Sequence, residues 1–377
     1  MLLVTHYYPE HKGGIEIVAG KLASQLAENG FEITWMATNE EFHSPVSGIK
    51  RIPASASNIV EKKLNIPFPL WSLQSFIELW RQVSRADIIH LHDYIYLCNT
   101  VAFLFAKIKN RPIIITQHIG FVPYDNFFFR AALAMMNRTI GTLMLRYSTK
   151  TIFISEVVRT YFTRGRKFGN QPMLIPNGVD VSVFRPCSEE IRLIERRNRN
   201  FPVDRFIFLF VGRFVEKKGL RILYRLAQAN QDSLWVFAGW GPIDPEKWQL
   251  PNVIVYRNLT SKELLPLYQM SDMLVLPSKG EGFPLVVQEA MACGTPAMVG
   301  TETATAIPDV SGMLLSKDVE GADVVSKWDK KIKELIENPA VIKKMREPVA
   351  RYVKQNWSWG KCAVEYEKIF KDVFLQC

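Results

Sequence analysis

The sequence predicts an α/β protein made of two doubly wound, Rossmann-like domains. Two observations support this fold class: short apolar runs alternate with amphipathic helical runs, and the whole alternation occurs twice along the chain. A chain of 377 residues and 43.3 kDa is also long for a single hydrophobic core. With 48% apolar and 22% charged residues, the composition is that of a folded globular protein. We expect the two domains to face each other across a cleft.

In the N-terminal half, five short apolar runs are the expected strands of a parallel sheet that helices cover on both faces. Between the first two runs, Ile15, Val18, Leu22 and Leu26 recur at helical spacing, and Gly30 marks the end of that helix. The expected strands are residues 2–5, 33–37, 87–91, 112–116 and 151–155.

The C-terminal half shows the same alternation of apolar strands and amphipathic helices. Thr260 and Glu263 have the spacing of a capping box, which predicts that a helix begins there, before the strand expected at 273–277. In doubly wound sheets, ligands bind beyond the carboxyl ends of the strands, so those ends are the places to search for function. The expected strands are residues 206–211, 234–238, 253–256, 273–277 and 296–299.

The two halves meet near NGVDVSVFRP (177–186), where Pro186 and the polar residues after it indicate the connection. We therefore place the first domain at 1–183 and the second at 184–356, with a final helical segment at 357–377.

The net charge and the cysteine pattern indicate which partners and which cellular compartment to expect. A formal net charge of +10 predicts an anionic partner, either the phosphates of a small ligand or an anionic lipid surface. Nucleic acid is not expected, because no RNP, helix-turn-helix or zinc-finger pattern accompanies the charge. The five cysteines are scattered without a CxxC pair, which is typical of a reduced, cytosolic chain without a zinc site. We find no long apolar segment and no signal peptide pattern, so we expect a cytoplasmic protein.

The most informative segment is PSKGEGFPLVVQEAMACGTP (277–296), which contains Glu281 and Glu289. Pro284 suits the first turn of a helix, and Gly294 is a typical stop. Glu281 is then expected in the preceding loop and Glu289 on the helix, so that the two carboxylates can hold two parts of one polar ligand while helix amides face its phosphates. The alternative is a buried helix with a surface acid at each end.

Two further loops follow expected strands. Gly13-Gly14 precedes the first helix, where backbone amides can approach a diphosphate, although an ordinary tight turn is as compatible with the pattern. In VGRFVEKKG (211–219), Arg213 and Lys218 can offset charge on a departing phosphate. The alternative for this loop is a solvated basic surface.

Other catalytic chemistries have weaker support. The chain lacks the Asp-x-Asp pair that holds Mg²⁺ or Mn²⁺ in many sugar transferases, and it lacks a GxSxG elbow, so we expect neither a metal cofactor nor hydrolase chemistry. His6, His90, His92 and His118 lie near strand ends without metal-ligand spacing. We interpret them as core or cleft-lining residues, and His118 is the best functional candidate among them.

In this order, these pieces resemble the retaining GT-B glycosyltransferases of family 4 (GT4). The resemblance covers nearly the whole chain, and the Glu-x7-Glu element is its most specific part. It also includes the aromatic final helix, WSWGKCAVEYEKIF (357–370), which in the family crosses back to the first domain. The residues that carry it are Gly13-Gly14, His118, PNGVD (176–180), GR and KG within 212–219, AGWGP (238–242), and Glu281 to Glu289.

The resemblance implies roles for individual residues. Glu289 would accept hydrogen bonds from both ribose hydroxyls of a nucleotide, and Glu281 would hold hydroxyls of the transferred sugar. Arg213 and Lys218 would neutralise the diphosphate in place of a metal, and His118 would contact the sugar near the reacting carbon. The remaining donor-binding residues it implies are Gly13, Gly14, Gly241, Tyr256, Gly282, Phe283, Pro284 and Leu285. The glycine that the family usually has near Arg257–Asn258 is absent, and the loop at 301–312 lacks the acidic residue that usually follows its glycine.

The activity implied is metal-independent transfer of a sugar, with retention, from a UDP- or GDP-sugar to a saccharide acceptor. A polyprenyl-linked acceptor in bacterial surface polysaccharide, lipopolysaccharide or glycolipid biosynthesis is expected. Two alternatives stay open: a sugar-nucleotide epimerase of the same fold, and a non-catalytic scaffold that keeps the fold.

Three segments of the first domain, 64–82, 126–150 and 159–172, combine aromatic residues or methionine with arginine and lysine. Amphipathic helices packed on the sheet explain most of these apolar residues. The sharper hypothesis is a surface that binds an anionic bilayer peripherally, on the inner face of the cell membrane.

Overall fold

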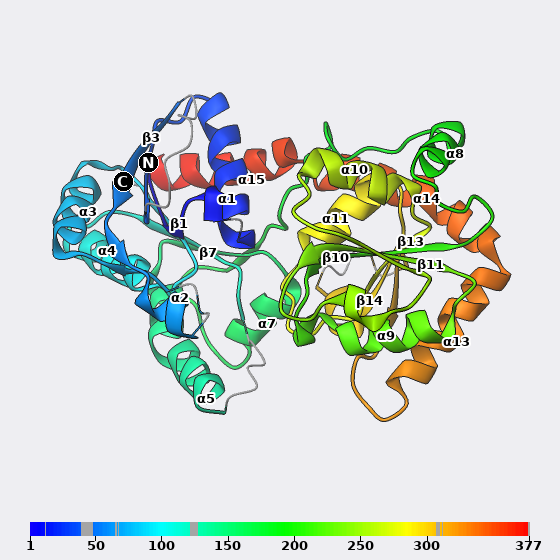
Figure 1. Ribbon diagram of the computed structural model, residues 1–377. Coiled ribbons are helices and arrows are strands. Elements are labelled where there is room, and N and C mark those ends of the chain that lie inside the picture. Colours follow the sequence, from blue (N-terminus) through cyan, green and yellow to red (C-terminus); the bar gives the residue numbers. More distant parts are fainter. Residues whose placement is uncertain are drawn as a thin grey trace. The chain divides into compact units, whose positions relative to one another are not determined.

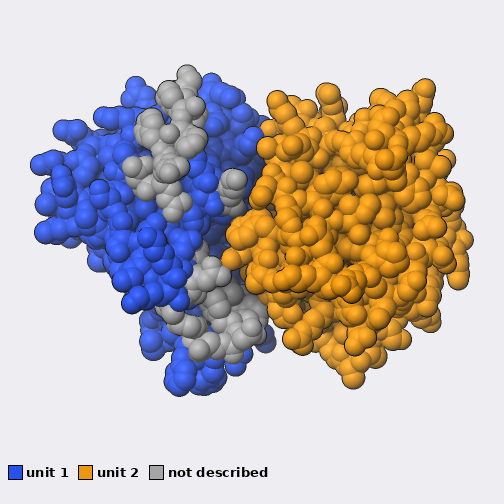
Figure 2. Space-filling model, in the orientation of Figure 1, with its two compact units in different colours: residues 1–178, 359–377 blue, residues 179–358 orange. Residues whose placement is uncertain are grey.

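The computed structural model describes residues 1–11, 13–38, 48–64, 66, 68–120, 127–306, 310 and 312–375. It divides into two compact units (Figures 1 and 2): unit 1 is residues 1–178 with 359–377, and unit 2 is residues 179–358. The sequence-based boundaries at 183/184 and 356/357 differ from these limits by five and by two residues. Each unit is an α/β layer structure built on its own parallel sheet, in agreement with the predicted fold class.

The sheet of unit 1 has the strand order β3-β2-β1-β6-β7-β8-β9, and all its neighbouring pairs are parallel. Its central strands are buried runs of branched and aromatic residues, which explains why they could be predicted. The strands are β1 (Leu2–Tyr7), β2 (Ile33–Thr38), β3 (Ile49–Ala54), β6 (Ile89–His92), β7 (Ile113–Gln117), β8 (Lys150–Phe153) and β9 (Met173–Leu174), with a separate antiparallel pair, β4 (Ala56–Ser57) and β5 (Leu70–Trp71).

Helices cover this sheet. The first helix begins after Gly13, and Gly30, in the left-handed region at φ 91°, follows its end as predicted. The final helix belongs to unit 1 and lies beside the first one (Figure 1), where Phe31 and Phe370 pack with ring centroids 5.8 Å apart. The helices are α1 (Gly14–Glu28), α2 (Ile59–Leu64), α3 (Leu73–Arg85), α4 (Leu97–Ile108), α5 (Phe127–Met136), α6 (Thr142–Tyr147), α7 (Glu156–Thr163) and α15 (Trp359–Leu375), with a 3₁₀ turn η1 (Pro9–His11) and a π-helical turn η2 (Asn137–Gly141) between α5 and α6.

The sheet of unit 2 has the order β12-β11-β10-β13-β14-β15, again with only parallel pairs. The chain therefore winds in one direction from β10 to β12 and in the other from β13 to β15, and the switch point lies between β10 and β13. The strands are β10 (Ile207–Arg213), β11 (Leu234–Trp240), β12 (Val253–Tyr256), β13 (Met273–Leu276), β14 (Ala297–Gly300) and β15 (Leu314–Lys317).

The predicted capping box is present in this unit. The Glu263 carboxylate accepts hydrogen bonds from the backbone N–H and the hydroxyl of Thr260, at 2.8 and 2.7 Å. Among the described residues, no helix has the length and apolar character needed to cross a bilayer. The helices of unit 2 are α8 (Glu189–Asn198), α9 (Leu220–Ala229), α10 (Ser261–Met270), α11 (Leu285–Ala292), α12 (Thr301–Ala304), α13 (Val324–Glu337) and α14 (Pro339–Asn356), with 3₁₀ turns η3 (Glu216–Lys218) and η4 (Pro245–Trp248).

Candidate functional site

In unit 2, the loops after β10 and β13 meet at the switch point of the sheet. Gly219 has a left-handed φ of 78°, and a Cβ atom there would lie 2.3 Å from the carbonyl oxygen of Pro277. The backbone N–H of Lys279 donates to the carbonyl of Lys217 at 2.9 Å. Only glycine fits this close approach in this backbone conformation, so the sequence KKG is required for the two loops to touch.

This contact brings two of the predicted site residues together. The Lys218 ammonium lies 2.7 Å from a carboxylate oxygen of Glu281, and the two side chains are only 16% and 14% exposed. Glu281 lies in the loop before α11, as expected. Arg213, the last residue of β10, places its guanidinium 4.8 Å from the ring centroid of Trp240 at the end of β11. The carboxyl edge of this sheet therefore carries two cations and a carboxylate directly at the switch point.

Glu289 lies on α11, as expected, about one turn from the first residue of the helix, Leu285. Its carboxylate accepts a hydrogen bond of 2.7 Å from the Tyr268 hydroxyl on α10. Glu289 is partly exposed, but its carboxyl group is surrounded by protein atoms. Burial of the carboxyl group raises its pKa to about 7. The hydrogen bond from Tyr268 holds one carboxylate oxygen of Glu289 in place, and the other oxygen can accept a hydrogen bond from a ligand.

The other donor-binding residues predicted in 277–296 differ in how much of each residue a ligand could reach. Pro284 is the N-cap of α11 and not part of its first turn, because its ψ of 124° is extended. The ring of Phe283 is buried against Trp357, with centroids 5.0 Å apart, so only its backbone is available to a ligand. Gly282 lies in the loop and Leu285 opens the helix, and Gly294 follows the helix end with the predicted left-handed φ, 73°.

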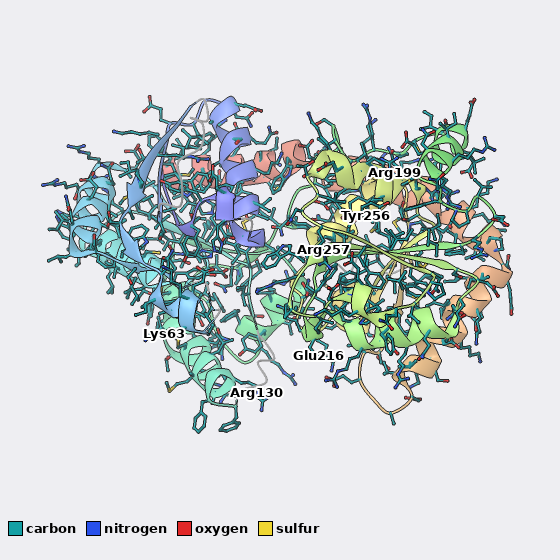
Figure 3. All side chains as sticks on the ribbon, viewed as in Figure 1. Lys63, Arg130, Arg199, Glu216, Tyr256 and Arg257 are labelled. Atoms are coloured by element: carbon teal, nitrogen blue, oxygen red, sulfur yellow. The ribbon has the colours of Figure 1, made fainter. Side chains whose placement is uncertain are left out.

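Two predicted residues lie at the ends of other strands of the sheet. Gly241 follows β11, and a Cβ atom there would lie 2.3 Å from the Phe214 carbonyl oxygen, so this glycine is needed for backbone packing. Tyr256 ends the edge strand β12, and Arg257 follows it (Figure 3). Arg257 forms an ion pair with Asp244 at 2.5 Å. Because β11 and β10 separate β12 from β13, Tyr256 is not grouped with the Lys218–Glu281 pair.

In unit 1, His118 follows β7 within a group of buried imidazoles. Its Nε2 atom lies 2.9 Å from Nδ1 of His92 at the end of β6. Burial lowers the pKa values of His90 and His118 to about 3, and it also lowers the pKa of His92, so these rings are neutral at physiological pH. A neutral imidazole at His118 can donate or accept a hydrogen bond without adding charge. The loop at 121–126, shortly after His118, lies outside the described residues.

Gly13 is the N-cap of α1, but the helix start is not open to a ligand in the way that the sequence suggested. The carboxylate of Glu16 folds back over it, so a Cβ atom at Gly13 would lie 2.2 Å from a Glu16 oxygen. His6 and His11 lie 3.0 and 3.1 Å from the same carboxylate. Although burial opposes ionisation, the hydrogen bonds from His11 and His6 lower the pKa of Glu16 to about 2. Around Gly14, in contrast, the space is open.

Sequence reasoning missed Glu16 and also Asp93, whose carboxylate holds the backbone at His118. Glu16 had a recognisable signal, because it is the third residue of the helix, where an acidic side chain commonly caps the free amides. In the described part of the chain, no group of three or more histidine, cysteine, aspartate or glutamate residues has the arrangement of a metal site.

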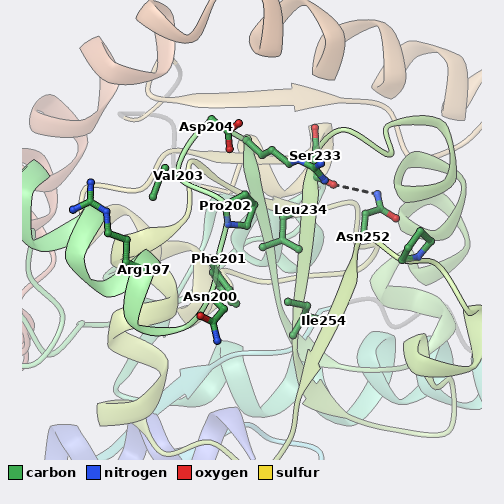
Figure 4. Close-up of a pocket in the computed structure, with 12 residues that line it drawn as sticks. Arg197, Asn200, Phe201, Pro202, Val203, Asp204, Ser233, Leu234, Asn252 and Ile254 are labelled. Carbon is green, nitrogen blue, oxygen red and sulfur yellow. Dashed lines mark hydrogen bonds between the residues drawn. The ribbon is translucent and has the colours of Figure 1, made fainter.

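A separate surface hollow of about 700 Å³ lies at the opposite, amino-terminal edge of the unit 2 sheet (Figure 4). Phe201 and Leu234 form part of its apolar floor, and Arg197 and Arg205 are among the exposed residues that line it. None of the predicted site residues lines this hollow, and it is on the edge where parallel α/β sheets do not carry their ligands.

The comparison with known families decides the identity. The Glycosyltransferase Family 4 model matches residues 12–183, and the Glycosyl transferases group 1 model matches residues 192–355. The chain belongs to the family 4 glycosyltransferases. An uncharacterized glycosyltransferase of Methanocaldococcus jannaschii is 26% identical over 99% of this chain and 98% of its own.

Solved structures confirm the GT-B fold of this glycosyltransferase. Sucrose-phosphate synthase from Thermosynechococcus elongatus superposes with a TM-score of 0.78 and 20% identity, covering 100% of this chain and 99% of that one. HepE of Anabaena, solved in complex with UDP-glucose, has a TM-score of 0.74 and 14% identity, covering 98% and 99% of the two chains.

Proposed function

We propose that this glycosyltransferase transfers a sugar, with retention of anomeric configuration and without a metal ion, from a UDP- or GDP-sugar to a saccharide acceptor. The observation that carries the proposal is the Lys218–Glu281 pair at the switch point of unit 2, together with Arg213 at the end of β10. A nucleotide diphosphate sugar has the matching chemistry, because it presents phosphate charge to cations and sugar hydroxyls to a carboxylate. The complex of HepE with UDP-glucose supports a uridine donor.

The proposed mechanism assigns a distinct role to each group. As the bond between the anomeric carbon and the diphosphate oxygen breaks, positive charge develops on the sugar and negative charge on the leaving group. Lys218 and Arg213 stabilise that negative charge, and Glu281 and His118 orient the sugar. The acceptor oxygen bonds to the same face of the carbon, and its proton passes to the departing phosphate. Glu289 holds the nucleotide through the ribose hydroxyls.

The test is turnover with UDP-, GDP- and ADP-sugars, in the presence and absence of EDTA, measured as release of the nucleoside diphosphate. Proton NMR of the new glycosidic bond gives its anomeric configuration. We expect activity that EDTA leaves unchanged and a product with the configuration of the donor. Loss of activity with EDTA contradicts the metal-independent mechanism, and an inverted product contradicts retention.

For the acceptor, we propose a lipid-linked saccharide of bacterial surface polysaccharide biosynthesis, presented at the inner face of the cell membrane. Helix α5 supports this with an exposed apolar end, where Phe127 and Phe128 are 65% and 80% exposed. Arg130 projects from the same helix (Figure 3), with its guanidinium 5.9 Å from the Phe127 ring centroid. Aromatic rings beside cations favour the interface of an anionic bilayer.

Liposome co-sedimentation tests this surface. Vesicles with anionic phospholipid should bind the enzyme at low salt and release it at high salt, since the attraction is partly electrostatic. The double variant Phe127→Ser/Phe128→Ser should bind several-fold less, whereas Val341→Ser, an exposed apolar position of unit 2, serves as the matched control. Equal binding of both variants contradicts the membrane proposal without affecting the donor chemistry.

A further inference from the structure

The backbone at His118 is held from the neighbouring strand by one carboxylate. An Asp93 carboxylate oxygen, Oδ1, accepts hydrogen bonds from the backbone N–H groups of His118 and Ile119, at 2.9 and 3.2 Å. Asp93 directly follows β6, and its side chain is completely buried. Two amides that converge on one oxygen fix the direction in which the chain leaves β7, and therefore the place from which the His118 side chain starts.

Asp93 is itself held in an uncommon conformation. Its φ of 63° lies in the left-handed region, where aspartate, asparagine and glycine are tolerated better than other residues. The buried Asn99 side chain donates from Nδ2 to the carbonyl oxygens of His92 and Asp93, at 2.6 and 2.7 Å. These bonds stabilise the turn after β6, so the carboxylate is presented to β7 by a rigid support.

The two turns are joined at further points. Gln117 accepts a hydrogen bond from the Tyr94 backbone N–H at 3.3 Å and donates one to the Ile119 carbonyl at 2.6 Å. The imidazoles of His92 and His118 are 2.9 Å apart at their nearest nitrogens. His118 is therefore fixed through its backbone by Asp93 and through its ring by His92.

We propose that Asp93 is a positioning residue that fixes the backbone of His118, and through it the imidazole that contacts the transferred sugar. This inference rests on the proposed function, which assigns the sugar contact to His118. Asp93 acts as a hydrogen-bond acceptor and not as a catalytic base, because two amides bind its Oδ1 atom and its whole side chain is buried away from a substrate. Protonation of the other oxygen, Oδ2, leaves Oδ1 an acceptor, so the task is independent of the charge on Asp93.

Two substitutions at position 93 separate these roles, since both are compatible with the left-handed backbone. Asp93→Asn keeps an acceptor oxygen without the charge, and Asp93→Gly removes the acceptor. We expect Asp93→Asn to retain kcat within about threefold, with an unchanged pH profile. Asp93→Gly should lower kcat by about 10- to 100-fold, the usual consequence of a misplaced catalytic contact. The control is Asn110→Gly, another left-handed position of unit 1, which should leave kcat unchanged.

A double-variant comparison shows whether Asp93 acts through His118. Asp93→Gly combined with His118→Ala should be within about threefold of the more damaged single variant, because residues that act as a unit are not additive. The affinity for UDP alone, measured by calorimetry, should be unchanged in all these variants. Losses that multiply, or an Asp93→Asn variant as inactive as Asp93→Gly, overturn the inference.

The outcomes also separate this inference from the proposed function. If His118→Ala turns over normally, the sugar contact assigned to His118 is wrong. If His118→Ala is impaired but Asp93→Gly is not, only the positioning role is wrong. If Asp93→Gly does not fold, Asp93→Asn decides: a kcat near that of the wild type supports the inference, and a loss equal to that of His118→Ala contradicts it.

Discussion

The enclosed carboxyl group of Glu289 predicts that Glu289→Gln makes the protein more stable while impairing nucleotide binding. Burial raises the pKa of Glu289 from 4.5 to about 7, so the folded protein favours its protonated form. At about 1.4 kcal/mol for each pH unit between those values, keeping this group ionised costs roughly 3 kcal/mol of folding free energy. Glutamine has the shape of the protonated acid and can still accept the hydrogen bond from Tyr268.

The sign of the pH dependence follows from the raised pKa. Below about pH 4.5 the carboxyl group is protonated in both the folded and unfolded states, and the substitution changes little. Between pH 4.5 and 7 the unfolded state loses its proton first, so the wild type loses stability relative to the variant as the pH rises. Above about pH 7 the advantage of Glu289→Gln is complete and constant.

The assay is thermal unfolding of both proteins from pH 5 to 9. For a unit of about this size, roughly 3 kcal/mol corresponds to an increase in Tm of roughly 6 to 12 °C at pH 8. Glu337→Gln, an exposed position on α13, is the matched control and should change Tm by less than about 1 °C. A Glu289→Gln variant whose Tm advantage is absent at pH 8, or equal at pH 5 and pH 8, refutes the reasoning.

Three further predictions concern unit 2. Lys218→Ala should lower kcat by about 10²- to 10³-fold in the nucleoside diphosphate release assay, because it removes a cation from the leaving group, whereas Lys279→Ala should not; equal rates for both contradict the assignment. Gly219→Ala should lower the free energy of unfolding by about 1–3 kcal/mol in urea denaturation, while Gly312→Ala, where a Cβ meets nothing within 4 Å, should be near neutral. Asp272→Ala leaves the buried Arg196 guanidinium without its carboxylate, so it should destabilise by about 3–5 kcal/mol; an unchanged urea midpoint argues against a structural role for this pair.

The ten strands expected from the sequence all correspond to strands of the two sheets. Nine of them are largely buried apolar runs, and the edge strand β12, VIVY, is apolar although only half-buried. The strands of the two large sheets that were missed, β3, β9 and β15, lie at sheet edges, and the separate short pair of β4 and β5 was missed as well. An edge strand pairs on one side only and does not need a continuous apolar run: β3 reads IKRIPA and exposes Lys50. Periodicity therefore predicts the centre of a parallel sheet better than its margins.

In the candidate site, some residues could be predicted from the pattern of their own segment, and others only from contacts between distant segments. Glu281, Glu289 and Lys218 lie in segments whose own pattern of glycine, proline and strand ends indicates a ligand-binding loop. Asp93 and Glu16 are single acidic residues without such a pattern, and their importance depends on strand order. Strands β1, β6 and β7 are neighbours in the sheet of unit 1, and this strand order places Glu16 and Asp93 at the same carboxyl edge as His118. Pairing of Lys218 with Glu281 likewise requires β10 and β13 to be neighbours.

The central claim is that the carboxyl edge of unit 2 holds a nucleotide diphosphate sugar with Glu289 on the ribose. The most direct measurement is a thermal-shift panel of UDP-, GDP- and ADP-sugars on the wild type, Glu289→Ala and the exposed control Glu337→Ala. At a fixed ligand concentration, a ligand that binds more tightly raises Tm further. We predict that one nucleotide raises the Tm of the wild type and of Glu337→Ala but not that of Glu289→Ala. A shift of equal size in Glu289→Ala, or no shift with any nucleotide sugar in the wild type, contradicts the account.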